Sequence, residues 1–325
     1  MIENIRKFPE MLRYTPEVSG RLHEYRGGKI VVMGMGGSAA AGDFFADWTG
    51  LDVRTVRHYD LPPFYGEGDT FIAVSYSGNT EETLSAYRQA VDRGMTGFVI
   101  TTGGKLGEMA KADGVPVLFV PEGYQPREAF GYLLKALVFG AREMGMVSDE
   151  AYGEFLKAVE SLPRYGEELG GGDSPTYEVA SHIYRRIPMI YSDAHIHSVA
   201  VRWKNQINEN SNAFAHVMPF PEHNHNEIEG FDHPEFLDTR AWLLFLKTDY
   251  DHPRVRLRME IVEDVLRDYV LGSYSVVAKG ESRMEQMLYL VWFGDFVSYW
   301  LTVEYGGDPY RIDRIKRLKE TLSRR

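Results

Sequence analysis

The sequence predicts an α/β protein with two domains, each built around a doubly wound parallel sheet. Short apolar runs of strand length alternate with helical stretches through most of the chain, which is the pattern of successive βαβ units. Three of the runs end in clusters of Gly, Ser and Thr, at residues 34–38, 75–80 and 101–104. The chain has 325 residues, more than one ordinary core accommodates. We therefore expect one domain over residues 1–147 and a second over 148–325.

The first half is expected to open with a helix and a connector over residues 1–27. This helix carries an apolar stripe formed by Ile5, Phe8, Met11 and Leu12. Strands are then expected at 29–33, 53–57, 71–74, 97–100 and 117–120. Helices are expected at 39–48, 80–93 and 125–143. Strands that alternate with helices in this way run parallel, and a doubly wound sheet binds its ligands at the carboxyl ends of its strands.

The second half repeats this organisation without repeating the sequence. A helix at 149–168 leads to a glycine-rich linker or loop, Gly170 to Pro175. Strands are expected at 188–192, 214–218, 242–246 and 274–278. Helices are expected at 195–212, at 283–305, where the sequence is strongly apolar, and at 311–325, where it is basic.

Composition limits the function. Hydrophobic residues make up 44% of the chain and charged residues 26%, as in globular proteins, and no apolar run is long enough to span a bilayer. The chain has no cysteine, which excludes disulfides, a thiolate nucleophile and Cys-ligated metal, and it lacks a signal-peptide pattern, so we expect a cytoplasmic protein. A net charge of −11 argues against nucleic-acid binding. Any phosphate site must therefore be made locally, from backbone dipoles and a few cations.

The segment from Phe71 to Thr83 contains the clearest candidate for a phosphate site. Ser75, Ser77 and Thr80 lie where a strand ends and a helix begins, where backbone N–H groups and the helix dipole favour an anion. The alternative is that these hydroxyls only cap the helix and shape the turn. Gly34 to Ser38 forms a second turn of this kind. It is not the dinucleotide fingerprint, because Ala39 stands where the third glycine is needed.

Arg127 and Glu209 are candidates for the chemistry. Arg127 follows Pro126 at the start of a predicted helix, where a guanidinium can reach an oxyanion; the alternative is a solvated arginine. Glu209 lies between two asparagines near the end of another helix, and their amides are expected to hold its carboxylate. A carboxylate fixed in this way suits a general base that removes a proton beside a carbonyl. The alternative is a solvated glutamate on a surface helix.

The segment Pro221 to Glu227 is a second polar cluster, with histidines that can exchange protons near neutral pH. Metal binding is the alternative for this cluster, through Glu222, His223, His225 and Glu227 together with His195 and His197. Against it, the histidines do not follow the helical His-x-x-x-His spacing, and alternating loop residues do not fix a coordination geometry. We therefore expect no metal.

Taken together, these segments resemble the bifunctional phosphoglucose/phosphomannose isomerases, a branch of the sugar-isomerase (SIS) domain proteins in the phosphoglucose isomerase superfamily. The matching segments recur in family order across nearly the whole chain. They are residues 34–38, 74–83, 101–104, 126–127, 204–210, 221–230 and 311–322. The serine-rich segment is specific for the domain, whereas the Asn-Glu-Asn and His-Asn elements narrow the resemblance to this subfamily.

The resemblance implies a homodimer of two-domain subunits, each domain a flavodoxin-like SIS fold, with the active site at the subunit interface. It implies a metal- and cofactor-independent isomerase of glycolysis and gluconeogenesis, which interconverts glucose 6-phosphate and fructose 6-phosphate through a cis-enediol. The phosphate would be held by Gly36, Gly37, Ser38, Ser75, Ser77 and Thr80.

The resemblance also assigns catalytic roles. Glu209 would move the proton between C1 and C2, and Arg127 would stabilise the enediolate. His225, supplied from the partner subunit, would assist ring opening. Lys319 matches a lysine of the terminal helix that acts near the ring oxygen.

Two departures from the family pattern bear on these expectations. The family has a threonine directly after the Asn/Asp-Pro of the last loop, whereas here Asp308-Pro309 is followed by Tyr310. That threonine is linked to room for either epimer at C2, so use of mannose 6-phosphate stays open. The histidine loop has His at two alternating positions where the family has adjacent polar residues, so His223 is an alternative to His225.

Two other functions are compatible with the same phosphate loops. One is a non-catalytic regulator that senses a sugar phosphate through its SIS domains. The other is an isomerase of amino-sugar phosphates or a related enzyme. A thermal-shift response to fructose 6-phosphate without turnover would favour the regulator, whereas deuterium exchange at C2 of several sugar phosphates would separate the isomerases.

Overall fold

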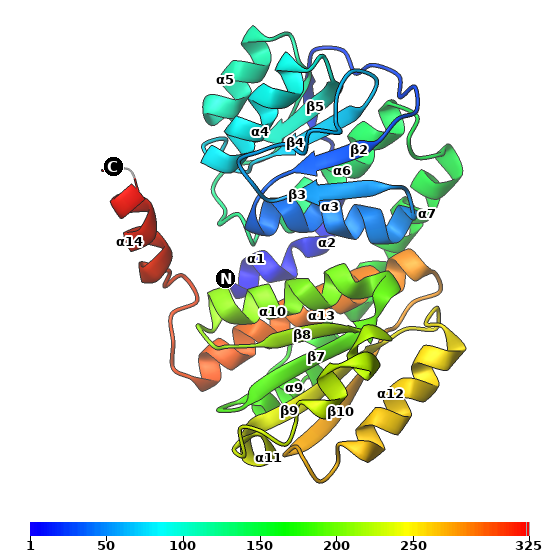
Figure 1. Cartoon of the computed structure of the whole chain (residues 1–325), viewed down its shortest axis with the longest axis vertical. Coiled ribbons are helices and arrows are strands. Elements are labelled where there is room, and N and C mark those ends of the chain that lie inside the picture. Colours follow the sequence, from blue (N-terminus) through cyan, green and yellow to red (C-terminus); the bar gives the residue numbers. More distant parts are fainter. Residues whose placement is uncertain (323, 325) are drawn as a thin grey trace. The chain divides into compact units, whose positions relative to one another are not determined.

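The computed structural model describes residues 1–322 and 324 and confirms the predicted α/β class. Two compact units are present (Figure 1). We call Lys7–Pro163 with Gly280–Leu288 the first-sheet unit, and Met1–Arg6, Arg164–Lys279 and Tyr289–Arg325 the second-sheet unit. The units are not continuous in sequence, whereas the predicted domains 1–147 and 148–325 are. Those domain limits stay a prediction.

The first sheet has six strands in the order β1-β6-β5-β4-β2-β3. All neighbours are parallel except β1, which pairs antiparallel with β6 at one edge. The five parallel strands follow the flavodoxin-like order, second-first-third-fourth-fifth. The strands are β1 (Glu17–Ser19), β2 (Ile30–Met33), β3 (Val53–Val56), β4 (Thr70–Val74), β5 (Thr96–Thr101) and β6 (Val117–Phe119).

Helices cover both faces of this sheet, which explains why β2 and β4 are buried along their whole length. On one face, α4 and α5 pack on a core that includes Phe71, Tyr87 and Leu106 (Figure 1). On the other face, Gly42 of α3 lies against Val32, and Gly140 of α6 lies against Phe98. The helices are α2 (Phe8–Arg13), α3 (Gly36–Thr49), α4 (Glu81–Asp92), α5 (Gly104–Ala112), α6 (Phe130–Glu143) and α7 (Asp149–Ser161).

The second sheet has four parallel strands in the order β10-β9-β7-β8. Counted along the chain, this is again the flavodoxin-like order with one strand fewer. One face packs against α12 through a core that includes Phe245, Met259 and Val262. The strands are β7 (Ile187–Asp193), β8 (His216–Phe220), β9 (Ala241–Lys247) and β10 (Gly272–Val277).

The helices of the second-sheet unit include short 3₁₀ turns, labelled η. The α-helices and 3₁₀ turns of this unit are α1 (Ile2–Arg6), η1 (Leu162–Tyr165, which begins in the other unit), α8 (Gly166–Gly170), α9 (Pro175–Ile183), η2 (Ala194–Ile196), α10 (His197–Asn210), η3 (Glu222–His225), η4 (Glu227–Glu229), α11 (Leu237–Arg240), α12 (Pro253–Val265) and α14 (Asp313–Leu322). The long helix α13 (Arg283–Glu304) contributes its last sixteen residues, from Tyr289, to this unit.

Several element predictions need correction. The connector predicted within residues 1–27 contains an edge strand, β1, which the sequence does not reveal because it has only three residues and all of them are exposed. The helix predicted from Gln125 begins only at Phe130, because residues 126–129 form a turn. The helix predicted over 149–168 ends as an α-helix at Ser161, before Pro163, and continues as η1 and α8. Of the predicted 311–325 helix, residues 323 and 325 lie outside the described residues.

Helices α10 and α13 meet along a buried polar seam. Arg202 forms an ion pair with Asp295 (2.7 Å), and the Gln206 amide donates to the other oxygen of that carboxylate (3.0 Å). The Asn210 amide donates to Ser298 Oγ at 2.9 Å. Gln206 and Asn210 are buried although both are polar, because α13 supplies polar partners.

Within the described residues, no helix combines the length and the apolar content that crossing a bilayer requires.

The contact between α10 and α13 predicts the effect of a methyl group at Gly294. A Cβ at this position would lie 2.3 Å from Trp203 Nε1, which donates to the Leu290 carbonyl at 2.8 Å. We expect Gly294→Ala to lower the free energy of unfolding by about 1–3 kcal/mol, as overpacked cores do. Denaturant titration measures this loss.

Gly153→Ala is the matched control, since Gly153 also lies inside a helix but has no atom within 4 Å of its Cβ position. There we expect a gain of about 0.5–1 kcal/mol from helix propensity. Equal effects of the two substitutions would contradict the packing argument.

Candidate functional site

The carboxyl edge of the first sheet brings the predicted phosphate loops together. Gly36 and Gly37 form the first turn of α3, where N–H groups have no acceptor inside the helix. A Cβ on Gly37 would lie 2.9 Å from the Pro126 carbonyl oxygen and 3.2 Å from the Arg127 Cα. The start of α3 therefore packs directly on the turn that carries Arg127, and only glycine permits this approach.

The serine loop lies between these elements. Ser38 Oγ accepts a hydrogen bond from the Tyr76 N–H at 3.2 Å. Ser75 is only 1% exposed and lies 3.1 Å from Thr80, hydroxyl to hydroxyl. Thr80 is the N-cap residue of α4, but its side chain makes no capping bond. Ser77 is exposed, and its hydroxyl accepts from the Asn79 N–H at 3.3 Å. Backbone and side-chain contacts thus fix the hydroxyls in one turn.

The third loop, Thr101 to Gly104, closes the edge. A Cβ on Gly78 would lie 1.9 Å from the Gly103 carbonyl oxygen, so the two loops touch backbone to backbone. The Thr102 N–H and hydroxyl both donate to the Tyr76 carbonyl, at 3.0 and 2.9 Å. The three predicted loops therefore form one continuous surface at the sheet edge.

Tyr76 was given no role when the site was predicted from the sequence. Its hydroxyl donates to the Pro121 carbonyl at 2.9 Å and accepts from the Tyr124 N–H at 3.0 Å. Burial raises the pKa of this phenol, so it stays a neutral donor. Tyr76 ties the serine loop to the segment that leads into Arg127, which is itself 3% exposed. A bulky aromatic between two serines was the available clue.

Glu209 lies in the last turn of α10, in the second-sheet unit. The Asn208 amide donates to the Ala213 carbonyl (2.8 Å), and the Asn210 amide binds Ser298, so these bonds anchor the helix end itself. A pocket of about 260 Å³ opens beside Glu209. Its lining residues are Asn208, Glu209, Asn212, Arg311, Ile312, Asp313, Arg314 and Ile315. Lys319 lies further along α14, exposed and outside this lining.

The two loop histidines differ in their surroundings. His225 is exposed at the end of η3. His223 is fully buried, stacked on Phe220 at 4.8 Å and edge-on to Tyr191 at 4.7 Å between ring centroids. Within the described part of the chain, His223 Nε2 has no hydrogen-bond partner. His225 is therefore the one of the two that is available to a substrate.

Glu227 organises the base of this loop. Its carboxylate accepts from the Tyr191 hydroxyl at 2.7 Å and pairs with His216 Nε2 at 2.8 Å. Burial alone would raise the pKa of Glu227, but the bonds from His216 and Tyr191 outweigh it and lower that pKa. Glu227 thus serves the loop structure as an ionised acceptor.

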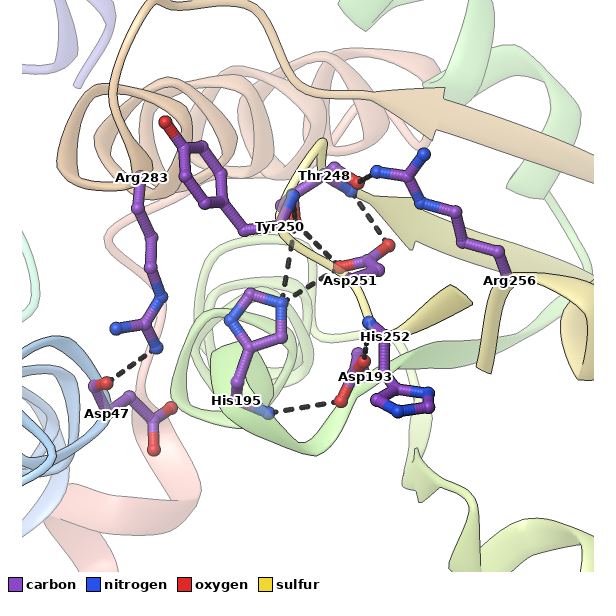
Figure 2. A network of polar contacts seen from close by, with 9 residues as sticks. All are labelled: Asp47, Asp193, His195, Thr248, Tyr250, Asp251, His252, Arg256 and Arg283. Carbon is purple, nitrogen blue, oxygen red and sulfur yellow. Dashed lines mark hydrogen bonds and ion pairs between the residues drawn. The ribbon is translucent and has the colours of Figure 1, made fainter. Parts of the chain in front are cut away.

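The ends of β7 and β9 carry a separate polar network (Figure 2). Asp193, His195 and Asp251 bring potential ligand atoms within 4.8 Å of one another, the one such group in residues 1–322 and 324. Both Asp251 oxygens accept from Thr248, and one also pairs with His195 Nε2 at 2.9 Å. The Asp193 oxygens accept from the N–H groups of His195 and His252. These bonds brace the two loops against each other.

Comparison with known proteins identifies the family of this chain. A family model described as the bacterial phospho-glucose isomerase C-terminal SIS domain matches residues 173–322. The bifunctional phosphoglucose/phosphomannose isomerase of Aquifex aeolicus is 37% identical, covering 95% of this chain and 94% of its own. The enzyme of the same name from Caldicellulosiruptor bescii is 35% identical, over 99% of both chains.

The chain belongs to the bifunctional phosphoglucose/phosphomannose isomerase family. Among solved structures, the C-terminal domain of glucosamine-fructose-6-phosphate aminotransferase from Francisella tularensis superposes with a TM-score of 0.70 at 11% identity, covering 95% of this chain and 94% of that one. At this identity the likeness concerns the fold alone. It agrees with the two flavodoxin-like sheets described above.

The site predicted for a member of this isomerase family thus falls into two groups. Gly36, Gly37, Ser38, Ser75, Ser77, Thr80 and Arg127 belong to the first-sheet unit, where the loops bring them together. Glu209, His225 and Lys319 belong to the second-sheet unit, at separate elements. Asn212, which lines the pocket with Glu209, was missed because it stands in no recognisable motif. Arg311 lines the same pocket and begins the matching segment 311–322, but it had been given no role.

The surroundings of His223 predict a pH-dependent stability. Burial lowers the pKa of His223 from 6.5, partly opposed by the charge of Glu227. The unfolded chain therefore takes up a proton first as the pH falls. The stability tied to the neutral ring is complete above about pH 6.5 and is lost as the pH falls toward the lowered pKa of the folded protein.

We expect His223→Phe to flatten the unfolding free energy between about pH 7 and 5, measured by urea titration at each pH. Glu227 does not interfere in this window: its lowered pKa makes its contribution fade only below its ordinary value of 4.5. His225→Phe, at an exposed position, is the control and should leave the slope unchanged. An unaltered slope in His223→Phe would refute the argument.

Proposed function

We propose that this protein is an aldose–ketose isomerase that interconverts glucose 6-phosphate and mannose 6-phosphate with fructose 6-phosphate. Membership of the bifunctional phosphoglucose/phosphomannose isomerase family carries the proposal. The bifunctional relatives lead us to include mannose 6-phosphate, although Tyr310 follows Asp308-Pro309 here. A coupled assay with both aldose phosphates, with and without EDTA, tests the activity and its independence of metal.

The loops of the first-sheet unit are proposed to bind the phosphate. Helices α3 and α4 both begin at the carboxyl edge beside the point where the strand order reverses, between β2 and β4. Parallel sheets bind ligands at this switch point, and helix N-termini favour anions. The hydroxyls of Ser38, Ser75, Ser77 and Thr80 add neutral donors, as a dianion requires in a protein with a net charge of −11.

Glu209 is proposed as the base. Its carboxylate removes the proton from C2 of the open-chain aldose, the electron pair moves into a C1–C2 double bond, and the C1 carbonyl oxygen gains a proton. Return of the proton to C1, with loss of the C2 hydroxyl proton, gives the ketose. The Arg127 guanidinium is proposed to stabilise the negative oxygen of the enediolate, because a preorganised charge lowers the barrier most where the opposite charge develops in the transition state.

The remaining roles concern ring opening and assembly. His225 of the partner subunit is proposed to assist opening of the sugar ring, and Lys319 to act near the ring oxygen. The exposure of both side chains supports contact with a substrate or a second chain. A homodimer with its active site at the subunit interface is part of this proposal, as is a cytoplasmic location, where sugar phosphates are metabolised.

The role of Glu209 predicts the effect of removing its charge. We expect Glu209→Gln to lower kcat by about 10²- to 10⁴-fold with little change in KM, because an amide cannot accept the C2 proton. The coupled assay measures both constants. Glu229→Gln, at an exposed glutamate of the same unit, is the control and should retain full activity. Wild-type turnover in Glu209→Gln would remove Glu209 from the mechanism.

The phosphate loops predict a different kinetic change. We expect Ser77→Ala to raise KM for both aldose phosphates by about 10- to 100-fold, the value of one hydrogen bond to a charged group. The melting temperature should stay constant, because the Ser77 side chain is exposed. Ser161→Ala, which removes a half-buried hydroxyl at the end of α7, is the control. An unchanged KM in Ser77→Ala would show that the phosphate binds elsewhere.

A further inference from the structure

Asn212 has an unusual backbone conformation just after the helix that carries Glu209. Its φ is +50°, in the left-handed region that few residues other than glycine adopt. It follows the C-cap residue Ser211, and the N–H groups of Ser211 and Ala213 both donate to the Ile207 carbonyl. Asn is tolerated at this position of a helix end, and glycine would serve the backbone equally well.

The Asn212 side chain makes bonds that glycine cannot make. Its amide nitrogen donates to the Glu209 carbonyl at 3.3 Å and to the Arg311 carbonyl at 3.2 Å. An amide group has two N–H donors, so one nitrogen can serve both acceptors. The side chain therefore ties the last turn of α10 to the segment that precedes α14.

That segment is also held through two tyrosine hydroxyls: that of Tyr305 accepts from the Arg185 N–H at 3.0 Å, and that of Tyr310 accepts from the N-terminal ammonium of Met1 at 2.6 Å. It runs from Tyr305 to Ile312 and contains Gly306 and Gly307, which lower its intrinsic stiffness. Asp308 closes a turn by accepting from the Tyr310 N–H on its side chain and from the Arg311 N–H on its carbonyl. The bond from Asn212 connects this turn to α10.

The tie lies at the pocket of about 260 Å³ that Glu209 and Arg311 both line. The Arg311 Nε donates to the Asp313 carboxylate at 2.9 Å, which orients the guanidinium from its own side. The position of the Arg311 main chain then sets where this cation stands relative to the Glu209 carboxylate. A carboxylate and a guanidinium that line one pocket can bind the same polar substrate only if the distance between them is fixed.

We propose that Asn212 is a positioning residue, which fixes the spacing between Glu209 and Arg311 across this pocket. The inference rests on the proposed function, because it takes Glu209 as the base for an open-chain sugar phosphate. Asn212 itself does not touch the reacting carbons. It acts through Glu209 and through the Arg311 segment.

Asn212→Gly is the decisive variant, since it keeps the left-handed backbone and removes only the amide. We expect kcat to fall by about 10- to 100-fold, the effect of a small misplacement of catalytic groups. KM should change little, because the proposed phosphate loops are untouched, and the melting temperature should not fall. Asn212→Asp also tolerates this backbone but places a carboxylate, without donors, against two carbonyls. Its kcat should fall further than that of Asn212→Gly.

Hydrogen exchange gives a second readout that does not depend on turnover. Amides of residues 306–315 should exchange faster in Asn212→Gly than in the wild type, whereas those of β7 should not change. Wild-type kcat and exchange in Asn212→Gly would show that Asn212 serves only the helix end, and would overturn the inference. If the wild type isomerises neither aldose phosphate, the proposed function fails, while the exchange experiment still decides whether the tie exists.

Discussion

Close approach of backbone to backbone at the carboxyl edge of the first sheet is the constraint on which the candidate phosphate site depends. Gly37 admits the turn before α6, and Gly78 admits the loop after β5, at distances that leave no room for a Cβ. These backbone contacts act together with the Tyr76 side chain, which ties the serine loop to the segment leading into Arg127. A site for a dianion can then be made from helix N-termini and neutral donors, which suits a chain whose net charge is −11.

The second-sheet unit positions its candidate base by different means. Helix α10 is held to α13 by buried polar groups that satisfy one another, with Asp295 accepting from both Arg202 and Gln206. Such a network is directional, since a rotation of α10 would leave buried donors and an unpaired charge without partners. Apolar contacts alone would define the rotation of the helix less strictly. The direction in which Glu209 leaves α10 is therefore set by buried polar contacts. A hydrophobic pattern in the sequence does not reveal such contacts.

The sequence allowed the fold to be predicted, together with the three Gly/Ser/Thr loops that meet at one sheet edge, because both depend on local patterns. Continuous apolar runs such as 30–33 and 70–74 become fully buried parallel strands, and their Gly/Ser endings lie at the predicted edge. The edge strand Glu17–Ser19 was not predicted, because its pairing with β6 is non-local and its side chains are exposed. Glu209 was predicted, but not the way its helix is held, and neither Asn212 nor the burial of His223 follows from a motif. These features depend on contacts between elements distant in sequence.

The two sheets share one strand order, yet the residues at their switch points differ in kind. Between β2 and β4 the first sheet presents glycines and hydroxyls whose backbone faces the edge. Between β7 and β9 the second sheet carries Asp193 and Asp251, whose oxygens are all engaged by Thr248, His195 and His252. A phosphate would meet two buried carboxylates there, at an electrostatic cost that the first sheet does not impose. One sheet edge therefore suits an anion, whereas the other stabilises the loops of the unit that carries the candidate residues Glu209 and His225 on α10 and η3.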